Sequence, residues 1–283
     1  MLSLIICSRN VSISKKLDEN IKETILVDYE LIIIDNSSNR LSIFEAYNIG
    51  IERSKGEVLV FLHDDILFRT AGWGNIVTRI FNENPGVGLL GIAGSNIKTK
   101  MPSTWWDGPG CISIRIVQHQ KGTKTIQNKN VGFVHKKLIN VAAIDGVLMI
   151  MSVDERIIFD TELKGFHNYD LDLSLQHFKL NKGICVTNEI VVEHFSGGYI
   201  NKDWYLSASR FHKKNFNILP VIIDSKINKL KMKMNEFNVG AAFVIKLLEM
   251  NLKKEALYWW YKLIKMKFYS KFHFKFIKKF LFG

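Results

Sequence analysis

The feature that most constrains the fold is a series of short, uninterrupted apolar runs separated by helix-like segments. The runs are rich in Ile, Leu and Val, as in strands buried on both faces of a sheet. They are residues 2–7, 31–34, 58–62 and 87–93, and the helix-like segments between them are 11–24, 43–54 and 73–84. This alternation of strand and helix predicts a mostly parallel sheet with helices on its faces, an α/β fold.

The regularity fades after about residue 95. Residues 95–135 mix Gly, Pro, Trp and Lys without a clean period, and they predict a long irregular segment with one short strand near 112–117. Further strand-like runs follow at 144–151, 183–188 and 190–193, with helical segments at 171–179 and 204–215. Beyond residue 224 the composition is helical throughout. We therefore expect a main domain over 1–220 and a basic, aromatic helical extension over 221–283.

The positive charge belongs to this extension. Residues 224–283 carry 14 Lys/Arg against 4 Asp/Glu, whereas residues 1–223 carry 25 against 23. A nucleic-acid-binding protein with a pI near 9.5 should spread basic residues over one face of its main domain. Because this main domain is almost neutral, we expect no nucleic-acid partner.

The extension also suggests where the protein acts. Residues 239–283 combine the apolar stretch VGAAFVIKLLEM with Tyr258–Tyr261 and many lysines, a composition suited to an anionic membrane surface. A helical hairpin packed on the main domain, or a homodimer contact, is the alternative. No run reaches the roughly 18 apolar residues of a spanning helix, and the start of the chain does not resemble a signal peptide. Three dispersed cysteines (Cys7, Cys111 and Cys185) fit a reducing compartment. We expect a cytoplasmic protein that binds the inner membrane face.

Polar residues follow three of the buried strands at the point where each strand ends. They are Ser8-Arg9-Asn10, Asp35-Asn36-Ser37-Ser38 and His63-Asp64-Asp65. Ligands of parallel sheets bind beyond the carboxyl ends of the strands. The sequence lacks the glycine-rich phosphate-binding motifs, and two adjacent carboxylates suit a divalent cation that bridges diphosphate oxygens. Such aspartates also serve as loop residues or helix caps, but three at successive strand ends favour a binding site.

The segments ICSRN, IIIDNSS and AYNIGIERSKGEVLVFLHDDI, in this order, resemble the first half of the family 2 glycosyltransferases, which have the GT-A fold. The resemblance implies a nucleotide-binding sheet flanked by helices. It implies that Asp35 holds the nucleobase and that Asn48 faces the nucleotide, with Ser8, Arg9 and Asp64 in the same nucleotide-sugar site. Asp65 corresponds to the metal ligand of the acidic D-x-D motif, and the cofactor is then Mn²⁺ or Mg²⁺. At His63 the family commonly has Asp.

The segment FHNYDLDLSLQHF resembles the family's E-D-x-D-L-x-x-R segment. Asp170 then corresponds to the catalytic base, and Asp172 lies near the acceptor, although it could equally cap a helix. Tyr169 and Gln176 replace the usual acidic residue and the usual Arg. A carboxylate suits the task, because an inverting transfer needs a base that takes the proton of the attacking hydroxyl.

Three further elements complete the resemblance. His194, in VVEHFSGGY, corresponds to a late metal-binding His, and Asp145-Gly146 to a D-G element that lines the donor sugar. Trp105 and Trp106 lie in the irregular segment expected over the acceptor. They either stack on sugar rings or anchor a loop.

We therefore expect an inverting, metal-dependent glycosyltransferase of polysaccharide biosynthesis. It would move a sugar from a nucleoside-diphosphate sugar, with a UDP-sugar favoured, to a hydroxyl of a glycan or lipid-linked acceptor. One alternative is a non-catalytic sugar-nucleotide-binding protein, because His63, Tyr169 and Gln176 depart from the family pattern. Another is a sugar nucleotidyltransferase, but its glycine-rich first loop is absent from CSRNVSISKK.

Overall fold

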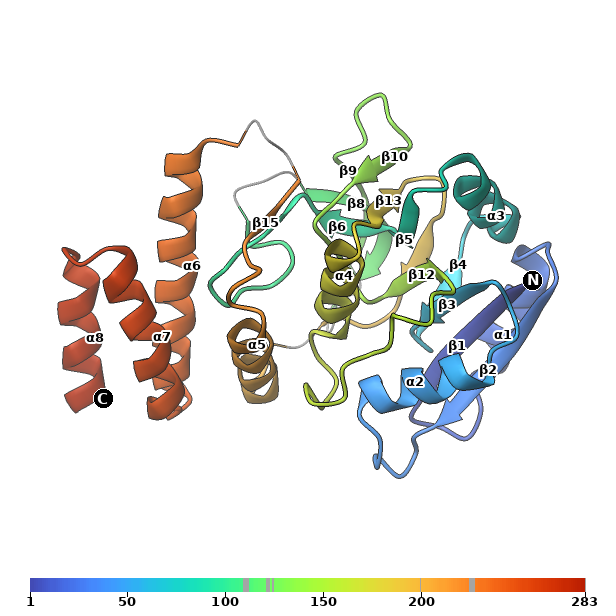
Figure 1. Ribbon diagram of the computed structural model, residues 1–283. Helices are drawn as coiled ribbons and strands as arrows, with labels where there is room; N and C mark the ends of the chain where they lie inside the picture. Colours follow the sequence, from blue (N-terminus) through green and yellow to red (C-terminus); the bar gives the residue numbers. More distant parts are fainter. Residues whose placement is uncertain (109–111, 121–122, 124, 199, 224–226, 283) are drawn as a thin grey trace.

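The computed structural model describes residues 1–108, 112–120, 123, 125–198, 200–223 and 227–282. Cys111, and the short part of the extension at 224–226, lie outside the described residues. A central seven-stranded sheet forms the body of the molecule (Figure 1), in the order β10-β13-β5-β12-β3-β1-β2. Its strands are β1 (Leu2–Ser8), β2 (Tyr29–Asp35), β3 (Val58–Leu62), β5 (Val87–Gly91), β10 (Leu138–Asn140), β12 (Leu148–Ser152) and β13 (Gly183–Thr187).

The predicted α/β fold is confirmed, with antiparallel strands within the sheet. β1 pairs in parallel with both β2 and β3, and β13 pairs in parallel with β5. β12 is antiparallel to its neighbours β3 and β5, and β10 is antiparallel to β13. Five strands therefore share one direction, and their carboxyl ends lie along one edge of the sheet.

The helices of the main domain cover both faces of the central sheet. They are α1 (Lys15–Thr24), α2 (Ile43–Arg53), α3 (Trp73–Glu83), α4 (Tyr169–Lys179) and α5 (Lys202–Lys214). Along β1 the side chains alternate between two apolar cores: Ile5 packs with the core that includes α2 and α4, whereas Leu4 and Ile6 pack with α1 and α3. This explains the uninterrupted apolar runs, since a strand covered on both faces has no solvent-facing positions.

A second, six-stranded sheet draws its strands from the segment that the sequence predicted as irregular with one strand and from residues before and after that segment. Its path is β11-β6-β8-β14-β4, and β9 pairs with β8. The strands are β4 (Ile66–Phe68), β6 (Ala93–Ser95), β8 (Ile112–His119), β9 (Ile126–Val131), β11 (Ala143–Ile144) and β14 (Val192–His194), and a separate pair joins β7 (Ile97–Lys98) to β15 (Val221–Ile222). This sheet matters for function, because it brings the late His194 to the end of β3.

The extension folds into three helices beside α5 (Figure 1). They are α6 (Lys229–Glu249), α7 (Lys253–Met266) and α8 (Lys271–Phe282). Trp259 and Phe276 are fully buried in their shared core, which also takes in Met101 and Ala208 of the main domain. Glu236 accepts hydrogen bonds from the backbone of Lys100 (2.7 Å) and Met101 (2.8 Å). The extension is thus packed on the main domain, as the packed-hairpin alternative expects. Within the described residues, no helix is both long and apolar enough to cross a membrane.

Candidate active site

The candidate site is assembled by strand pairing at the end of β3. His63, Asp64 and Asp65 link β3 to β4, and β4 pairs antiparallel with β14 so that Ile66 lies opposite His194. The carbonyl of Asp65 accepts a hydrogen bond from Phe195 N at 3.0 Å. The second sheet therefore places His194, from near the end of the main domain, directly beside residues 63–65, which we call the acidic turn.

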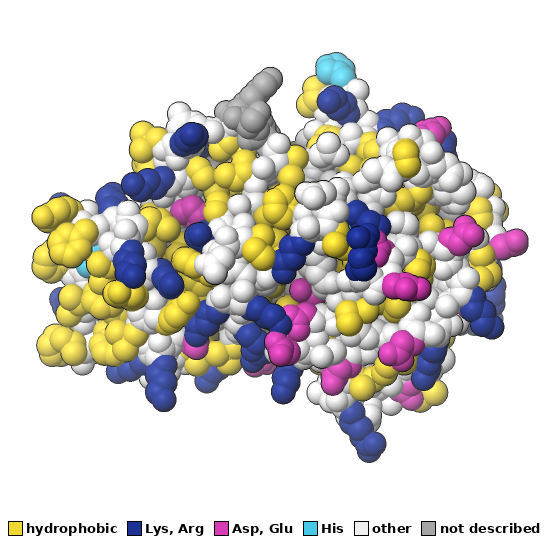
Figure 2. All heavy atoms as spheres, viewed as in Figure 1, with side chains coloured by type: hydrophobic (Ala, Val, Ile, Leu, Met, Phe, Trp, Pro, Cys, Tyr) yellow, Lys and Arg dark blue, Asp and Glu magenta, His cyan; other side chains and the backbone are white. Residues whose placement is uncertain are grey.

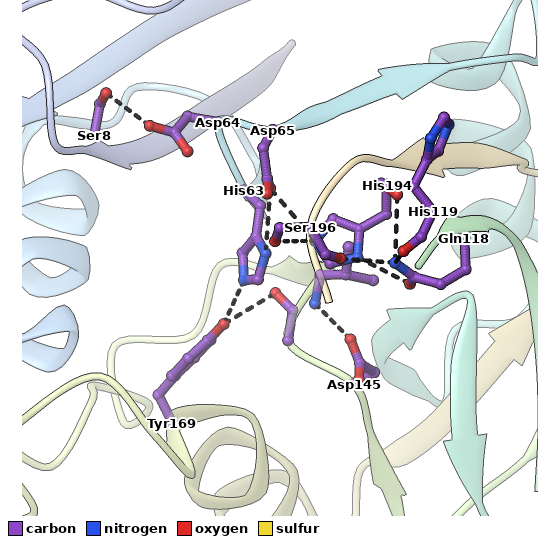
Figure 3. A network of polar contacts seen from close by, with 12 residues as sticks. Ser8, His63, Asp64, Asp65, Gln118, His119, Asp145, Tyr169, His194 and Ser196 are labelled. Carbon is purple, nitrogen blue, oxygen red and sulfur yellow. Dashed lines mark hydrogen bonds and ion pairs between the residues drawn. The ribbon is translucent and has the colours of Figure 1, made fainter. Parts of the chain in front are cut away.

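Three side chains converge there as potential metal ligands. One ligand atom from each of His63, Asp65 and His194 lies within 4.8 Å of the other two. Asp65 Oδ1 is 3.4 Å from His194 Nε2 and 3.8 Å from His63 Nδ1 (Figure 3). Two imidazoles and a carboxylate form a donor set that binds divalent transition metals. The sequence predicted Asp65 and His194 for this role, and the geometry adds His63, the residue that departs from the family pattern.

The electrostatics of this cluster suit a cation. Burial alone would raise the pKa of Asp65, but the hydrogen bonds and charge that protonated His194 supplies, the hydrogen bond from Ser196 and the charge of protonated His63 hold this pKa below its usual range. Burial is the main cause that lowers the pKa of His63, and electrostatic repulsion from His194 lowers it further. At neutral pH the carboxylate is therefore ionised and the His63 imidazole is neutral. These are the protonation states that metal ligands require.

The predicted nucleotide-binding residues lie on the other side of the acidic turn. Ser8 Oγ donates a hydrogen bond to Asp64 Oδ2 at 2.8 Å, so Asp64 faces β1 (Figure 3). Ser8 is paired with Asp35 in the β1–β2 ladder, and Arg9 follows as an exposed side chain. Asp35 is exposed, and hydrogen bonds from the backbone and side chain of Ser37 lower its pKa. Ser8, Arg9, Asp35 and Asp64 thus lie along one edge, at the ends of β1, β2 and β3.

Two predicted site residues have hydrogen-bond partners within the protein. The amide of Asn48 exchanges two 2.8 Å hydrogen bonds with the backbone of Phe159. Buried Asp172 accepts hydrogen bonds from Asp160 N (3.0 Å) and Gln176 Nε2 (2.9 Å). Both side chains hold the loop that precedes α4. We therefore leave Asn48 out of the proposed nucleotide contacts, and we leave Asp172 out of the proposed acceptor contacts.

Asp170 and the D-G element lie across the site from the acidic turn. Burial raises the pKa of half-buried Asp170 to about 7, and the negative charge of Asp145 adds to the shift. Asp145 accepts hydrogen bonds from Trp105 Nε1 (2.7 Å) and Val147 N (2.9 Å). A Cβ on Gly146 would lie 2.4 Å from the Tyr169 hydroxyl, so only glycine fits there. A carboxyl group with a pKa near 7 has the proton affinity that suits a general base.

The two tryptophans differ in exposure. Trp105 is buried and tied to Asp145, whereas Trp106 packs edge-to-face on it and keeps 43% of its side chain exposed. The structure therefore gives Trp105 the anchoring role and leaves Trp106 free to contact a ligand.

Sequence reasoning missed Gln118 and Ser196, which contact His194. Gln118 Oε1 lies 3.1 Å from His194 Nδ1, and Ser196 Oγ lies 3.4 Å from His194 Nε2. Gln118 is paired with His194 in the parallel β8–β14 ladder. The local signal for Gln118 was its position near the end of residues 112–119, where apolar and polar residues alternate. This alternation predicts a strand, but it does not indicate which distant strand pairs with it.

This sheet, with an acidic turn at the end of β3 and a late histidine beside it, has the arrangement that the resemblance to the GT-A fold implies. A family model described as "Glycosyltransferase like family" matches residues 3–218, about three quarters of the chain. The chain therefore belongs to this glycosyltransferase-like family.

A solved structure supports the fold. GalNAc-T7, crystallised with UDP, GalNAc and Mn²⁺, is 13% identical with a TM-score of 0.52, and the match covers 83% of this chain and 54% of that one. This chain thus spans about half the length of that enzyme. S. aureus TarS 1-349 in complex with UDP-GlcNAc is 10% identical with a TM-score of 0.48, over 94% of this chain and 88% of that one. None of the curated proteins matches the sequence. At 13% identity we take the likeness to GalNAc-T7 to show the fold alone.

Proposed function

We propose that the protein is an inverting, metal-dependent glycosyltransferase that uses a UDP-sugar and transfers its sugar to a hydroxyl of a glycan or lipid-linked acceptor. The observation that carries the proposal is the convergence of His63, Asp65 and His194 beside the nucleotide-facing edge formed by Ser8, Asp35 and Asp64. GalNAc-T7, which shares this fold, was solved with UDP, and this supports the choice of donor.

In this proposal the metal-binding residues act on the departing diphosphate, whereas the base acts on the acceptor hydroxyl. His63, Asp65 and His194 would hold a divalent cation, which offsets the negative charge of the departing diphosphate when bound. Of the two ions expected from the sequence, Mn²⁺ suits two imidazole ligands better, since Mg²⁺ prefers oxygen. Asp170 takes the proton of the acceptor hydroxyl, Asp145 and Gly146 line the donor sugar, and Trp106 contacts the acceptor.

Thermal unfolding with a panel of nucleotide sugars tests the donor. A UDP-sugar present with Mn²⁺ at 100 times its Kd should stabilise the native state by about 2.7 kcal/mol. In a domain of this size, that corresponds to a rise in Tm of roughly 5–10 °C. EDTA should remove most of this shift, and GDP-sugars at equal concentration serve as the control. If none of the UDP-sugars raises the Tm, the proposed donor is wrong. If a UDP-sugar binds but is not turned over, the non-catalytic alternative is favoured.

The sequence places the division between the two parts at 220/221, but Val221 and Ile222 pair with β7 of the main domain, so we propose that the extension begins after Ile223. We also propose that the extension holds the protein at the inner face of an anionic membrane. The exposed side of α8 carries Phe274, Ile277 and Leu281 at helical spacing, and Lys271, Lys275 and Lys278 are close to them. Residues 256–283 contain seven lysines and no Asp or Glu. Figure 2 shows apolar and basic side chains interspersed over this end of the molecule. A second copy would meet this face with the same charge, so anionic lipid is the better complement.

Point variants of α8 test the membrane surface better than truncation, because deletion would expose Met101 and Ala208. Each lysine near an anionic leaflet contributes about 1 kcal/mol, so the triple variant Lys271→Gln, Lys275→Gln, Lys278→Gln should bind phosphatidylserine vesicles on the order of 100-fold more weakly. Co-sedimentation measures this loss, which should shrink at high salt. The matched control replaces the exposed Lys15, Lys55 and Lys136 with Gln. Equal binding by both triple variants would refute the assignment, and so would a wild-type protein that dimerises through α8 and ignores vesicles.

A further inference from the structure

We propose that Gln118 and Tyr169 are positioning residues that fix which nitrogen of His194 and of His63 carries the ring proton. Neither side chain is placed to ligate a cation itself. Each contacts the ring nitrogen that does not approach Asp65, and so decides whether the other nitrogen presents a lone pair. The inference rests on the proposed metal-dependent function, and its test includes a measurement made without metal.

The orientation of the Gln118 amide follows from its neighbours. Its Nε2 lies 2.7 Å from the carbonyl oxygen of Ser196, 3.0 Å from that of His119 and 3.3 Å from that of His194. Carbonyl oxygens only accept hydrogen bonds, so this end of the amide must be the NH₂ group. The other end, Oε1, is therefore an acceptor, and it faces His194 Nδ1 at 3.1 Å (Figure 3).

This orientation sets the tautomer of His194. An acceptor opposite Nδ1 requires the proton to be on Nδ1, and in the neutral ring Nε2 then carries the lone pair. His194 Nε2 is the atom that lies 3.4 Å from Asp65 Oδ1, inside the proposed metal cluster. The pairing of Gln118 with His194 in the β8–β14 ladder holds the two side chains in register.

Tyr169 acts in the same way on His63. Its hydroxyl lies 2.7 Å from His63 Nε2, and it donates to the carbonyl of Gly146 at 3.4 Å. A hydroxyl has one proton, so an oxygen that donates to Gly146 accepts from His63 Nε2–H. The proton on Nε2 leaves the lone pair on Nδ1, the atom that lies 3.8 Å from Asp65 Oδ1. The two departures from the family pattern, at His63 and at Tyr169, are thus in direct contact.

The consequence is a pair of imidazoles whose lone pairs are fixed before any cation arrives. Residues that hydrogen-bond the remote nitrogen of a metal-binding His fix its tautomer and ring orientation, and their loss typically costs 10- to 100-fold in metal affinity. We expect this range for Gln118→Ala and for Tyr169→Phe.

Two measurements test the proposal on the 283-residue chain. Nitrogen NMR of ¹⁵N-histidine-labelled, metal-free protein, at a pH where the rings are neutral, reports which nitrogen of each ring is protonated. Titration calorimetry with Mn²⁺ alone gives the affinity. Gln120→Ala is the matched control, because it removes an exposed amide two residues further along the same segment and should leave both measurements unchanged.

The outcomes separate this inference from the proposed function. His194 protonated on Nε2, or Gln118→Ala and Tyr169→Phe binding Mn²⁺ as tightly as wild type, would overturn the inference. The assigned tautomers in a wild-type protein that binds no Mn²⁺ would support the positioning and refute the metal-dependent function instead. Thermal unfolding identifies any variant that fails to fold. If Gln118→Ala or Tyr169→Phe fails to fold, the tautomer of the ring that it contacts, His194 or His63, decides in the wild type.

Discussion

Replacing Asp65 with alanine should lower the affinity for Mn²⁺ by at least about 100-fold and weaken the binding of UDP to the same degree as removing the metal. Loss of a group that merely contacts a metal ligand costs about 10- to 100-fold, so loss of the ligand itself should cost no less. Asp65 is also the only anionic member of the cluster with His63 and His194. Without Asp65, two neutral imidazoles would face the cation, and no negative charge in the cluster would offset its positive charge.

Calorimetric titration of Mn²⁺, and of UDP with and without Mn²⁺, measures both effects. In the wild type, Mn²⁺ should strengthen UDP binding, whereas in Asp65→Ala the two titrations with UDP should coincide. Asp28→Ala is the control, since it removes an exposed carboxylate from a turn on the same domain. If Asp65→Ala retains wild-type Mn²⁺ affinity, the cation does not bind at this cluster and the proposed role of His194 is lost with it.

The first half of the fold could be predicted because its signals are local. The apolar run at 58–62 coincides with β3, and the helices predicted at 43–54 and 73–84 each end within one residue of the observed α2 and α3. Buried strands and amphipathic helices each have a characteristic pattern of apolar residues that can be recognised in the sequence. The acidic turn could be predicted for the same reason, since His63–Asp65 directly follow a strand that was recognised.

Strands were expected at 112–117 and 190–193, but their assembly into a second sheet could not be predicted, because most of its strands are short and their partners are distant. β4, β6 and β14 have three residues each, and β11 has two. Segments of this length carry no measurable period, and their pairing is decided by tertiary contacts. The position of Gln118 beside His194 depends on the β8–β14 ladder, so no motif in the sequence could indicate it.

Asn48 and Asp172 illustrate a different limit. Both are polar residues on helices that face the site region, and their positions matched residues of the family that have functional roles. In the structure they supply hydrogen-bond partners to the adjacent backbone positions Phe159 and Asp160. A buried backbone group without a partner is costly, but the sequence does not show which loop will need one.

The catalytic base is tested by Asp170→Asn, which should bind UDP and Mn²⁺ with affinities within about twofold of the wild type and lose 10²- to 10⁴-fold in turnover. Proton removal from the acceptor is needed only in the transition state, so its loss should affect kcat and leave ground-state binding unchanged. Asparagine preserves the shape of the side chain, but it cannot accept a proton at neutral pH. Turnover with the UDP-sugar identified by thermal unfolding, measured beside calorimetric binding, separates the two quantities.

Asp172→Asn is the matched control, because it makes the same chemical change in the same turn of α4. Its carboxylate contacts Asp160 N and Gln176, so the substitution should change stability and leave turnover within a few-fold of wild type. If Asp170→Asn transfers sugar at a near wild-type rate, the base lies elsewhere. Asp145 would then be the next candidate, because it lines the same side of the site.

The pH dependence gives the same assignment a second test. Burial and the charge of Asp145 raise the pKa of Asp170 to about 7. A base acts only when deprotonated, so below that pH turnover should fall about tenfold per pH unit, and above it turnover should be constant. The raised pKa also means that ionised Asp170 destabilises the folded protein above the ordinary carboxyl range, so Asp170→Asn should unfold at a higher temperature than wild type at pH 8. A variant that is stabilised at pH 8 but inactive would show that the site uses part of the folding energy to keep a carboxylate basic.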